Sequence, residues 1–279
     1  MKIFKENLKK NLTNIGIKKG DTVYLGINLG KIFASYSTDL FSNNENINSI
    51  RLKCSKLIFE TLKNLLGQNG TIIVPTFSFS FLKLKNFHFK KTPSTLGYFE
   101  NFFLKENGVQ RSKHPIYSIS AWGKNKKILE PCGNFSFGVN SPFSNFLDLN
   151  VKFLNIGNRW VETCTYVHHL EHLNGINHRF YKPTTGIVNF NGYYKTDTYY
   201  NPVRFFNLKS KKAEYKIEKY LIKGEMIREL NKSFYCSLIN SRDIYHVGLN
   251  ILKTKPYYFM SKKTICYIDR NDKLSFKIN

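Results

Sequence analysis

Apolar and polar residues alternate along the chain in two periods, one typical of helices and one typical of strands. Helical spacing of apolar residues predicts helices over residues 1–15, 47–66 and 95–108, each closed by a glycine. Short apolar or β-branched runs predict strands over residues 21–28, 71–77, 116–122 and 151–157. The stretch "GKIFASYSTDLFSNNENIN" becomes polar and rich in asparagine toward its end, so we expect a loop there.

The remaining third of the chain changes character. Residues 186–206 predict short strands around an Asn-Gly turn, and residues 209–231 predict a long charged helix. The last forty residues predict a strand, a short helix and a closing hairpin. Strands that alternate with helices indicate the α/β class. We therefore expect one domain over residues 1–279, with a central mixed β-sheet flanked by helices and small C-terminal β elements.

The charge of the chain narrows the classes of partner. The 279 residues carry 43 Lys and Arg against 19 Asp and Glu, a formal net charge of +24. Such a field attracts anions, including phosphorylated cofactors. The lysines recur along the whole chain and come with no RNA-recognition signature, zinc-finger pair or basic zipper. We therefore expect no nucleic acid partner.

Cysteine usage and hydropathy point to a reducing compartment. The five cysteines are odd in number and widely spaced, which favours neither a disulfide framework nor a zinc ribbon. The N-terminal segment lacks a continuous apolar core, and no segment approaches the length of apolar chain that spans a bilayer. We expect a cytoplasmic protein without membrane insertion.

The stretch "TCTYVHHLEH" at residues 163–172 concentrates titratable side chains directly after a strand and a glycine turn. Thr163 or Thr165 can cap a helix there. Positions three and four apart share a helix face, so His168, Glu171 and His172 project together, while Val167 and Leu170 supply the buried side. We expect His168 and Glu171 to form a proton-handling pair.

The same residues also spell H-x-x-E-H, a zinc-protease signature. In that interpretation His168 and His172 would be ligands and Glu171 the base, with a third ligand such as Glu225 or Glu229. No local signature surrounds those two glutamates, so we expect no metal. A zinc hydrolase nevertheless remains one alternative.

A second block, "RSKHP" at residues 111–115, combines a guanidinium, a hydroxyl and an imidazole ahead of a strand. Arginine binds phosphate in a bidentate manner. Ser94 and Ser112 could donate hydrogen bonds to a phosphate or to an amide-rich chain. This block favours binding of a phosphorylated cofactor over zinc chemistry.

The order of these segments resembles the aminoglycoside 3-N-acetyltransferase family. The shared segments are "PTFSF" (75–79), "TPSTLG" (92–97), "RSKHP" (111–115), "FGVNSPF" (137–143), "FLNIG" (153–157) and "TYVHHLEH" (165–172). The resemblance runs over roughly residues 10 to 180. It implies an N-acyltransferase that uses acetyl-CoA or another acyl-CoA as co-substrate, with an α/β sheet and a cleft for CoA.

The resemblance also implies roles for residues. His168 would be the general base, Glu171 its acidic partner and Thr165 a donor to the developing oxyanion. Residues expected to line the CoA site come from the strand-end loop and from the segments upstream of the helix: Gly26, Ile27, Asn28, Thr76, Ser94, Arg111, Ser112 and His114.

This chain departs from the drug-modifying members of the family at two places. Their His-Ser-Ser strand-end loop is replaced by Gly26, Ile27 and Asn28. The acidic residues that would meet a polycationic drug are missing between Tyr199 and Lys212, and Asp197 is the nearest acid. A basic protein repels polycations at long range.

We therefore expect a small-molecule amine acceptor, an amino sugar and in particular a nucleotide-linked one used for surface polysaccharide. The alternatives are an aminoglycoside antibiotic as acceptor, the zinc hydrolase, and a non-catalytic basic binding module.

Overall fold

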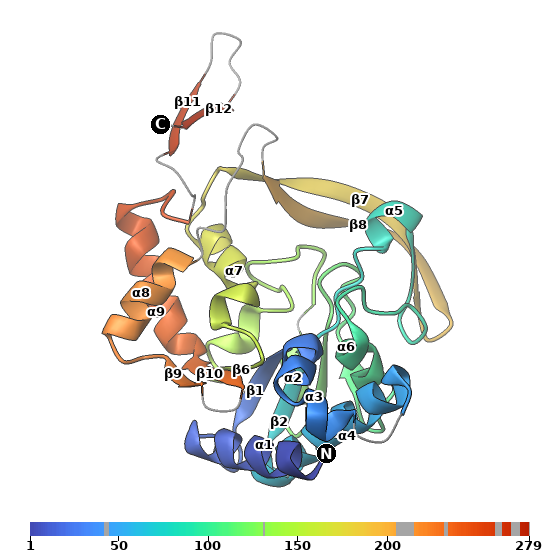
Figure 1. Ribbon diagram of the computed structural model, residues 1–279. Coiled ribbons are helices and arrows are strands. Elements are labelled where there is room, and N and C mark those ends of the chain that lie inside the picture. Colours follow the sequence, from blue (N-terminus) through green and yellow to red (C-terminus); the bar gives the residue numbers. More distant parts are fainter. Residues whose placement is uncertain are drawn as a thin grey trace.

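The structure is a computed structural model and describes residues 1–41, 45–130, 132–204, 215–231, 234–259, 264–268 and 274–278. In this part of the chain a seven-stranded sheet forms the centre of the molecule (Figure 1). Its strands, in the order in which they lie across the sheet, are β4 (Gln110–Arg111), β5 (Ile119–Gly123), β2 (Thr71–Pro75), β1 (Thr22–Ile27), β6 (Lys152–Ile156), β10 (Tyr235–Asn240) and β9 (Arg228–Asn231). Strand β1 is parallel to β2 and β6, and the other neighbouring pairs are antiparallel. The predicted mixed sheet is confirmed.

Helices cover both faces of this sheet (Figure 1). They are α1 (Lys2–Asn14), α2 (Leu29–Ser35), α3 (Ser37–Leu40), α4 (Ile47–Leu66), α6 (Tyr98–Phe103), α7 (Tyr166–Leu173), α8 (Tyr215–Lys223) and α9 (Ser241–Thr254). The short helix α5 (Phe81–Leu84) lies apart from the sheet (Figure 1), where Phe81 packs with Val188 and Tyr199. Successive side chains of a strand point to opposite faces. Val23 and Leu25 of β1 accordingly join the core under α1, α4 and α6, and Tyr24 joins the core under α7, α8 and α9. The α/β fold class is confirmed.

A long hairpin, separate from the sheet, extends beyond the carboxyl ends of its parallel strands (Figure 1). It consists of β7 (Arg179–Phe190) and β8 (Tyr193–Arg204), and the short strand β3 (Asn86–His88) pairs in parallel with β7. Asn191 and Gly192 form the turn at φ 57° and 96°, as the Asn-Gly signal predicts. The chain closes with β11 (Thr264–Ile268) and β12 (Leu274–Ile278), which are the predicted C-terminal hairpin.

Two predicted elements differ from the structure. The segment expected to be a loop after β1 contains α2 and α3, because the side chain of Asn28 accepts a hydrogen bond from Lys31 N and starts a helix. The long charged helix is shorter than predicted: α8 ends at Lys223, the chain turns near Gly224, and residues 228–231 form β9. Residues 209–214 of that prediction lie outside the described residues.

Strand β5 begins later than predicted. The backbone N–H groups of Ile116 and Tyr117 donate to His114 Nδ1 at 3.2 and 3.0 Å, so these residues form a turn before the strand starts at Ile119. Helix α6 is also shorter than the predicted 95–108. In the described part of the chain, every helix is too short or too polar to span a bilayer.

Candidate active site

Helix α7 starts at the edge of the sheet where the parallel strands end. Gly157 follows β6 at φ +76°, and a 3-10 turn over Trp160–Glu162 leads into the helix. A Cβ on Gly157 would lie 2.8 Å from the carbonyl oxygen of Asn28, so the chains after β1 and β6 approach closely here. Sites in α/β proteins gather at such strand ends.

His168 and Glu171 are joined within α7. His168 Nδ1 lies 2.8 Å from Glu171 Oε2, one helical turn along. Glu171 is only 3% exposed, and the same Oε2 accepts a hydrogen bond from Arg179 Nε at 2.8 Å. Nε2 of His178 lies 3.1 Å from the other carboxylate oxygen. The predicted pair therefore exists as part of a buried network of four side chains.

The network fixes the charge of Glu171. Burial alone would raise the pKa of this carboxyl, but the charge of Arg179 and the contacts with His168 and His178 outweigh it and hold the pKa well below its usual range. An ionised carboxylate only accepts hydrogen bonds, so the proton of the neutral imidazole of His168 sits on Nδ1. Nε2 of His168 is then the basic nitrogen, as in a His–carboxylate catalytic pair.

Aromatic rings surround His168 without closing it off. The ring of Phe137 lies edge-on, with its centroid 5.7 Å from that of His168, and Tyr117 packs on Phe137 at 4.8 Å. The His168 side chain is 21% exposed. A substrate can therefore reach this imidazole from the surface while its other side is held by the protein.

The two threonines before α7 do not cap it as predicted. Thr165 occupies the N-cap position, but its side chain makes no capping hydrogen bond and its backbone is already helical. Thr163 Oγ1 instead donates to the side chain of Asn155 and to Trp160 O at 3.1 Å. The capping prediction is wrong because the preceding 3-10 turn carries the chain into the helix.

The other two histidines of α7 have separate partners. His169 is buried, its Nδ1 accepts from Gly138 N at 3.2 Å, and burial followed by His172 lowers its pKa to about 4. His172 Nδ1 lies 2.6 Å from the hydroxyl of Tyr181. Gly138, at φ +95°, sits so close that a Cβ there would lie 2.2 Å from the His172 ring.

The proposed third zinc ligands lie elsewhere. Glu229 is on the edge strand β9 and accepts a hydrogen bond from Tyr235, and Glu225 follows α8 at φ 54°. Among the described residues, no group of three or more His, Cys, Asp or Glu side chains is placed to hold a metal ion. The H-x-x-E-H spacing thus brings together His168 and Glu171, while His172 turns to Tyr181.

A cavity of about 340 Å³ opens beside the strand-end loop. Ile27 and Asn28 of that loop line it together with Gly97, which belongs to the "TPSTLG" segment. Glu100 of α6 lies in its wall, and burial raises the pKa of this carboxyl to about 7. The structure therefore brings together two segments that the sequence expects around CoA.

Gly26 lies just behind this cavity. A Cβ on Gly26 would come within 2.4 Å of Asn155 Oδ1 and 2.9 Å of Thr163. The Asn155–Thr163 contact fills the space that a larger residue would need at this position. This explains in physical terms why the loop begins with glycine.

The remaining residues expected at the CoA site are buried and bonded within the protein. Thr76 is fully buried, with its hydroxyl 2.8 Å from that of Ser120, and Ser112 Oγ accepts from Ile119 N at 3.0 Å. Burial lowers the pKa of His114 to about 3. Ser94, 6% exposed, accepts from Leu96 N at 3.2 Å. The hydroxyls of Thr76, Ser94 and Ser112 are thus engaged within the protein, whereas Nε2 of His114 is buried without a hydrogen-bond partner among the described residues.

Arg111 is turned inward rather than toward solvent. It is 6% exposed and donates to Thr76 O and Thr92 O, both at 2.7 Å, and to Ser78 Oγ at 2.6 Å. The guanidinium thereby ties together the "PTFSF" and "TPS" segments. From the sequence we expected Arg111 to bind phosphate directly. The geometry instead favours a role in positioning these loops.

Arg179 and His178 were missed by the sequence analysis. They follow α7 by a short connection through Gly175, so the chain folds back onto Glu171. The string "NHRF" at residues 177–180, shortly after the glycine that follows the helix, was the available signal.

The fold and the site together define a class. A mixed α/β sheet, a cavity beside the loop after a parallel strand and a His–carboxylate pair at the same edge of the sheet are typical of an enzyme that uses general-base catalysis.

Comparison with known proteins identifies the family. The family model described as "Aminoglycoside 3-N-acetyltransferase" matches residues 46–253, so the chain belongs to the aminoglycoside 3-N-acetyltransferase family. It is an acetyltransferase, and acetyl-CoA fits as its co-substrate. Among curated proteins no sequence matches this chain significantly.

Solved structures share the fold at low sequence identity. The aminoglycoside acetyltransferase AAC-VIa bound to sisomicin is 17% identical over 90% of this chain and 97% of its own, with a TM-score of 0.72. AAC-IIIb in a binary complex with CoASH is 16% identical over 90% of this chain and 96% of its own, with a TM-score of 0.71. The YokD protein from Bacillus subtilis is 19% identical over 90% and 99%, with a TM-score of 0.68.

Proposed function

We propose that this protein transfers an acetyl group from acetyl-CoA directly to an amine of an amino sugar, with His168 as the general base. The observation that supports this most is the His168–Glu171 contact at 2.8 Å, anchored by Arg179 and exposed at the strand-end edge of the sheet. No covalent enzyme intermediate is required.

The proposed chemistry follows from what an amine needs. An alkyl ammonium must lose a proton before it can attack a thioester, and His168 Nε2 accepts that proton. The amine nitrogen forms a bond to the acyl carbon, the carbon–sulfur bond breaks, and the thiolate leaves and is protonated. Glu171, fixed in its ionised form, stabilises the charged imidazole. Thr165 stays the proposed donor to the oxyanion.

For acetyl-CoA we propose the cavity beside the strand-end loop, with Gly26, Ile27 and Asn28 at its base. Ile27 and Asn28 line this cavity together with Gly97 and Arg51, which supports placing part of the cofactor there. Ser94, Thr76, Ser112, His114 and Arg111 then act by holding the adjoining loops in place, because each makes hydrogen bonds within the protein.

Two acceptors remain, each with its own support. The neighbouring structures with bound sisomicin or gentamicin favour an aminoglycoside. The charge of +24 favours an acceptor that carries phosphate, such as a nucleotide-linked amino sugar of surface polysaccharide synthesis. Asp197, the nearest acid, is bonded to Lys195 at 2.7 Å and to Asn134 at 2.9 Å, so its charge is compensated.

An acceptor panel tests the proposal. The protein is supplied with acetyl-CoA and either an aminoglycoside such as sisomicin or a nucleotide-linked amino sugar, and release of free thiol is followed. We expect amine-dependent release with at least one of the two, and its identity selects the acceptor. Thiol release that no amine accelerates would contradict acyl transfer to an amino sugar.

A further inference from the structure

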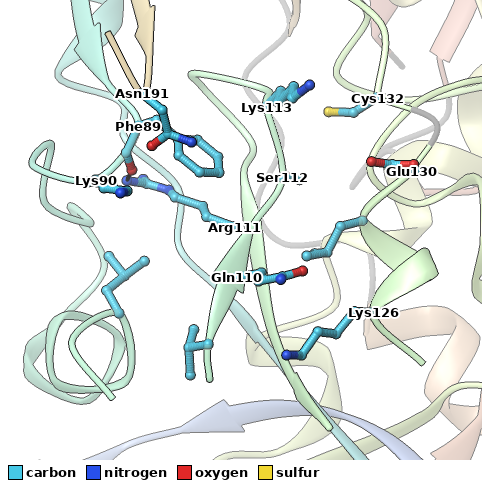
Figure 2. A pocket seen from close by; sticks show the side chains of 13 residues that line it. Phe89, Lys90, Gln110, Arg111, Ser112, Lys113, Lys126, Glu130, Cys132 and Asn191 are labelled. Atoms are coloured by element: carbon cyan, nitrogen blue, oxygen red, sulfur yellow. Dashed lines mark hydrogen bonds between the residues drawn. The ribbon is translucent and has the colours of Figure 1, made fainter. Parts of the chain in front are cut away.

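A second cavity of the described structure has a lining that does not include the His168–Glu171 pair. It encloses about 870 Å³ along the outer edge strand β4. Figure 2 shows Arg111 near its centre, with Phe89, Lys90 and Asn191 on one side and Lys126, Glu130 and Cys132 on the other. Lys113 stands at the end of the strand segment. The proposed acyl-transfer chemistry uses neither this cavity nor its lysines.

The charge of the cavity wall is unbalanced. Lys90, Lys113 and Lys126 line it against a single acid, Glu130. Among the described residues, no carboxylate lies within ion-pair distance of these three ammonium groups or of Arg111.

The environment of Arg111 adds to this excess of positive charge. Its guanidinium is buried, yet all its partners are neutral: three backbone carbonyls and the hydroxyls of Ser78 and Ser118. It also packs over the ring of Phe87 at 4.8 Å. Burial without a counter-ion lowers the pKa of Arg111 to about 9. Buried charges in proteins are normally paired, and the dipoles of these neutral partners compensate the charge of Arg111 only in part, so its positive charge adds to that of the adjacent cavity.

We propose that this cavity binds the diphosphate of a nucleotide-type ligand. A diphosphate supplies the charge that four cationic side chains lack, and Phe89 offers a ring face beside them. The cavity volume suits a molecule of that size. The diphosphate is that of a nucleotide-linked acceptor, an inference that rests on the proposed function, in which acetyl-CoA occupies the cavity beside the strand-end loop.

The position of the cavity is compatible with an acceptor that reaches His168. Cys132 lines the cavity, and Phe137, five positions later, contacts the His168 ring. An extended chain of that length spans at most about 18 Å between Cα atoms. A nucleotide-linked sugar is of comparable length, so its two ends could occupy the two places.

Direct binding tests the proposal without requiring turnover. The full-length protein is titrated with UDP, inorganic pyrophosphate and CoA in separate calorimetric experiments. The cavity variant carries Lys90→Gln, Lys113→Gln and Lys126→Gln. The matched control carries Lys91→Gln, Lys19→Gln and Lys127→Gln, which remove the same charge from outside the cavity. The control is essential because a net charge of +24 attracts anions everywhere.

We expect the cavity variant to raise the Kd of UDP and of pyrophosphate on the order of tenfold or more, and the control to leave both within about twofold. An effect of the cavity variant on CoA alone would assign the cavity to the co-substrate and overturn the proposal. Equal Kd values for the two variants with all three ligands would overturn the proposal. His168→Ala should bind UDP and CoA normally, which separates this inference from the proposed catalytic role.

Discussion

At the residue scale, Glu171 contacts side chains that come from three different places along the chain. It receives His168 from its own helix, Arg179 from the start of β7 and His178 from the connection between them. Because it is buried and ionised, it fixes both the orientation and the proton position of the His168 ring. In the proposed mechanism it acts through His168 and is a positioning residue.

Replacing Glu171 by glutamine should lower kcat by about 10²- to 10⁴-fold, the range lost when general-base catalysis fails. The KM for acetyl-CoA should change little, because the carboxylate faces the imidazole and not the proposed cofactor cavity. Steady-state kinetics of thiol release measure both values. Glu60→Gln, at an exposed acid paired only with Lys63, is the matched control. A Glu171→Gln enzyme that keeps its kcat and loses only acetyl-CoA affinity would contradict this role.

The pair itself could be predicted from the sequence, and its surroundings could not. Spacing of three along a helix fixes the His168–Glu171 contact locally. Arg179 contacts Glu171 only because the chain reverses after Gly175, and Arg111 is buried only because three loops close over it. The Arg179–Glu171 contact and the burial of Arg111 depend on tertiary packing, which residue types alone do not reveal.

At the scale of elements, helix α6 places an acid in the wall of the proposed cofactor cavity. Glu100 is 7% exposed, and Gly97 at the start of the helix leaves room for its carboxylate, since a Cβ there would lie 2.8 Å from Glu100 Oε2. Burial raises the pKa of Glu100 from 4.5 to about 7. Its protonated form is thus favoured by folding.

This raised pKa has a consequence for stability. The folded state binds a proton more tightly than the unfolded state, so the contribution of Glu100 is full below pH 4.5 and is lost as the pH rises through about 7. Glu100→Gln should therefore raise the free energy of unfolding at pH 8, by up to about 3 kcal/mol, and change it little near pH 4.

Chemical denaturation of both proteins at the two pH values measures this difference. Glu60→Gln serves again as the control for the same substitution at an exposed position. If the stability difference between Glu100→Gln and the natural protein were the same at pH 4 and pH 8, Glu100 would not titrate between them.

Helices and strands could be predicted from the sequence where a continuous apolar pattern defines them. The prediction failed where one side chain starts a helix or one glycine ends it. Helix α4 and the buried strands β1, β2 and β6 follow from uninterrupted apolar spacing. Helix α2 was missed because its start depends on one Asn28 side chain, and α8 was overextended past Gly224. The single-domain range 1–279 and the cytoplasmic location stay predictions.

At the scale of the whole molecule, the net charge of +24 sets which ligands approach easily. CoA is a polyanion, so its association benefits from the field of the entire surface. The Kd for CoA should rise roughly tenfold between 50 and 500 mM NaCl, because salt screens such long-range attraction. Calorimetric titration at several salt concentrations measures it. A Kd independent of salt would mean that local contacts alone hold the molecule.

The acyl-transfer account depends most directly on His168. The decisive measurement is the rate of amine-dependent thiol release from acetyl-CoA by His168→Ala, with CoA affinity determined on the same preparation. His246→Ala, at an exposed histidine of α9, is the matched control. The account predicts that His168→Ala lowers kcat by at least about 10²-fold, while its Kd for CoA and the activity of the control stay unchanged. Turnover by His168→Ala close to that of the natural protein would contradict it.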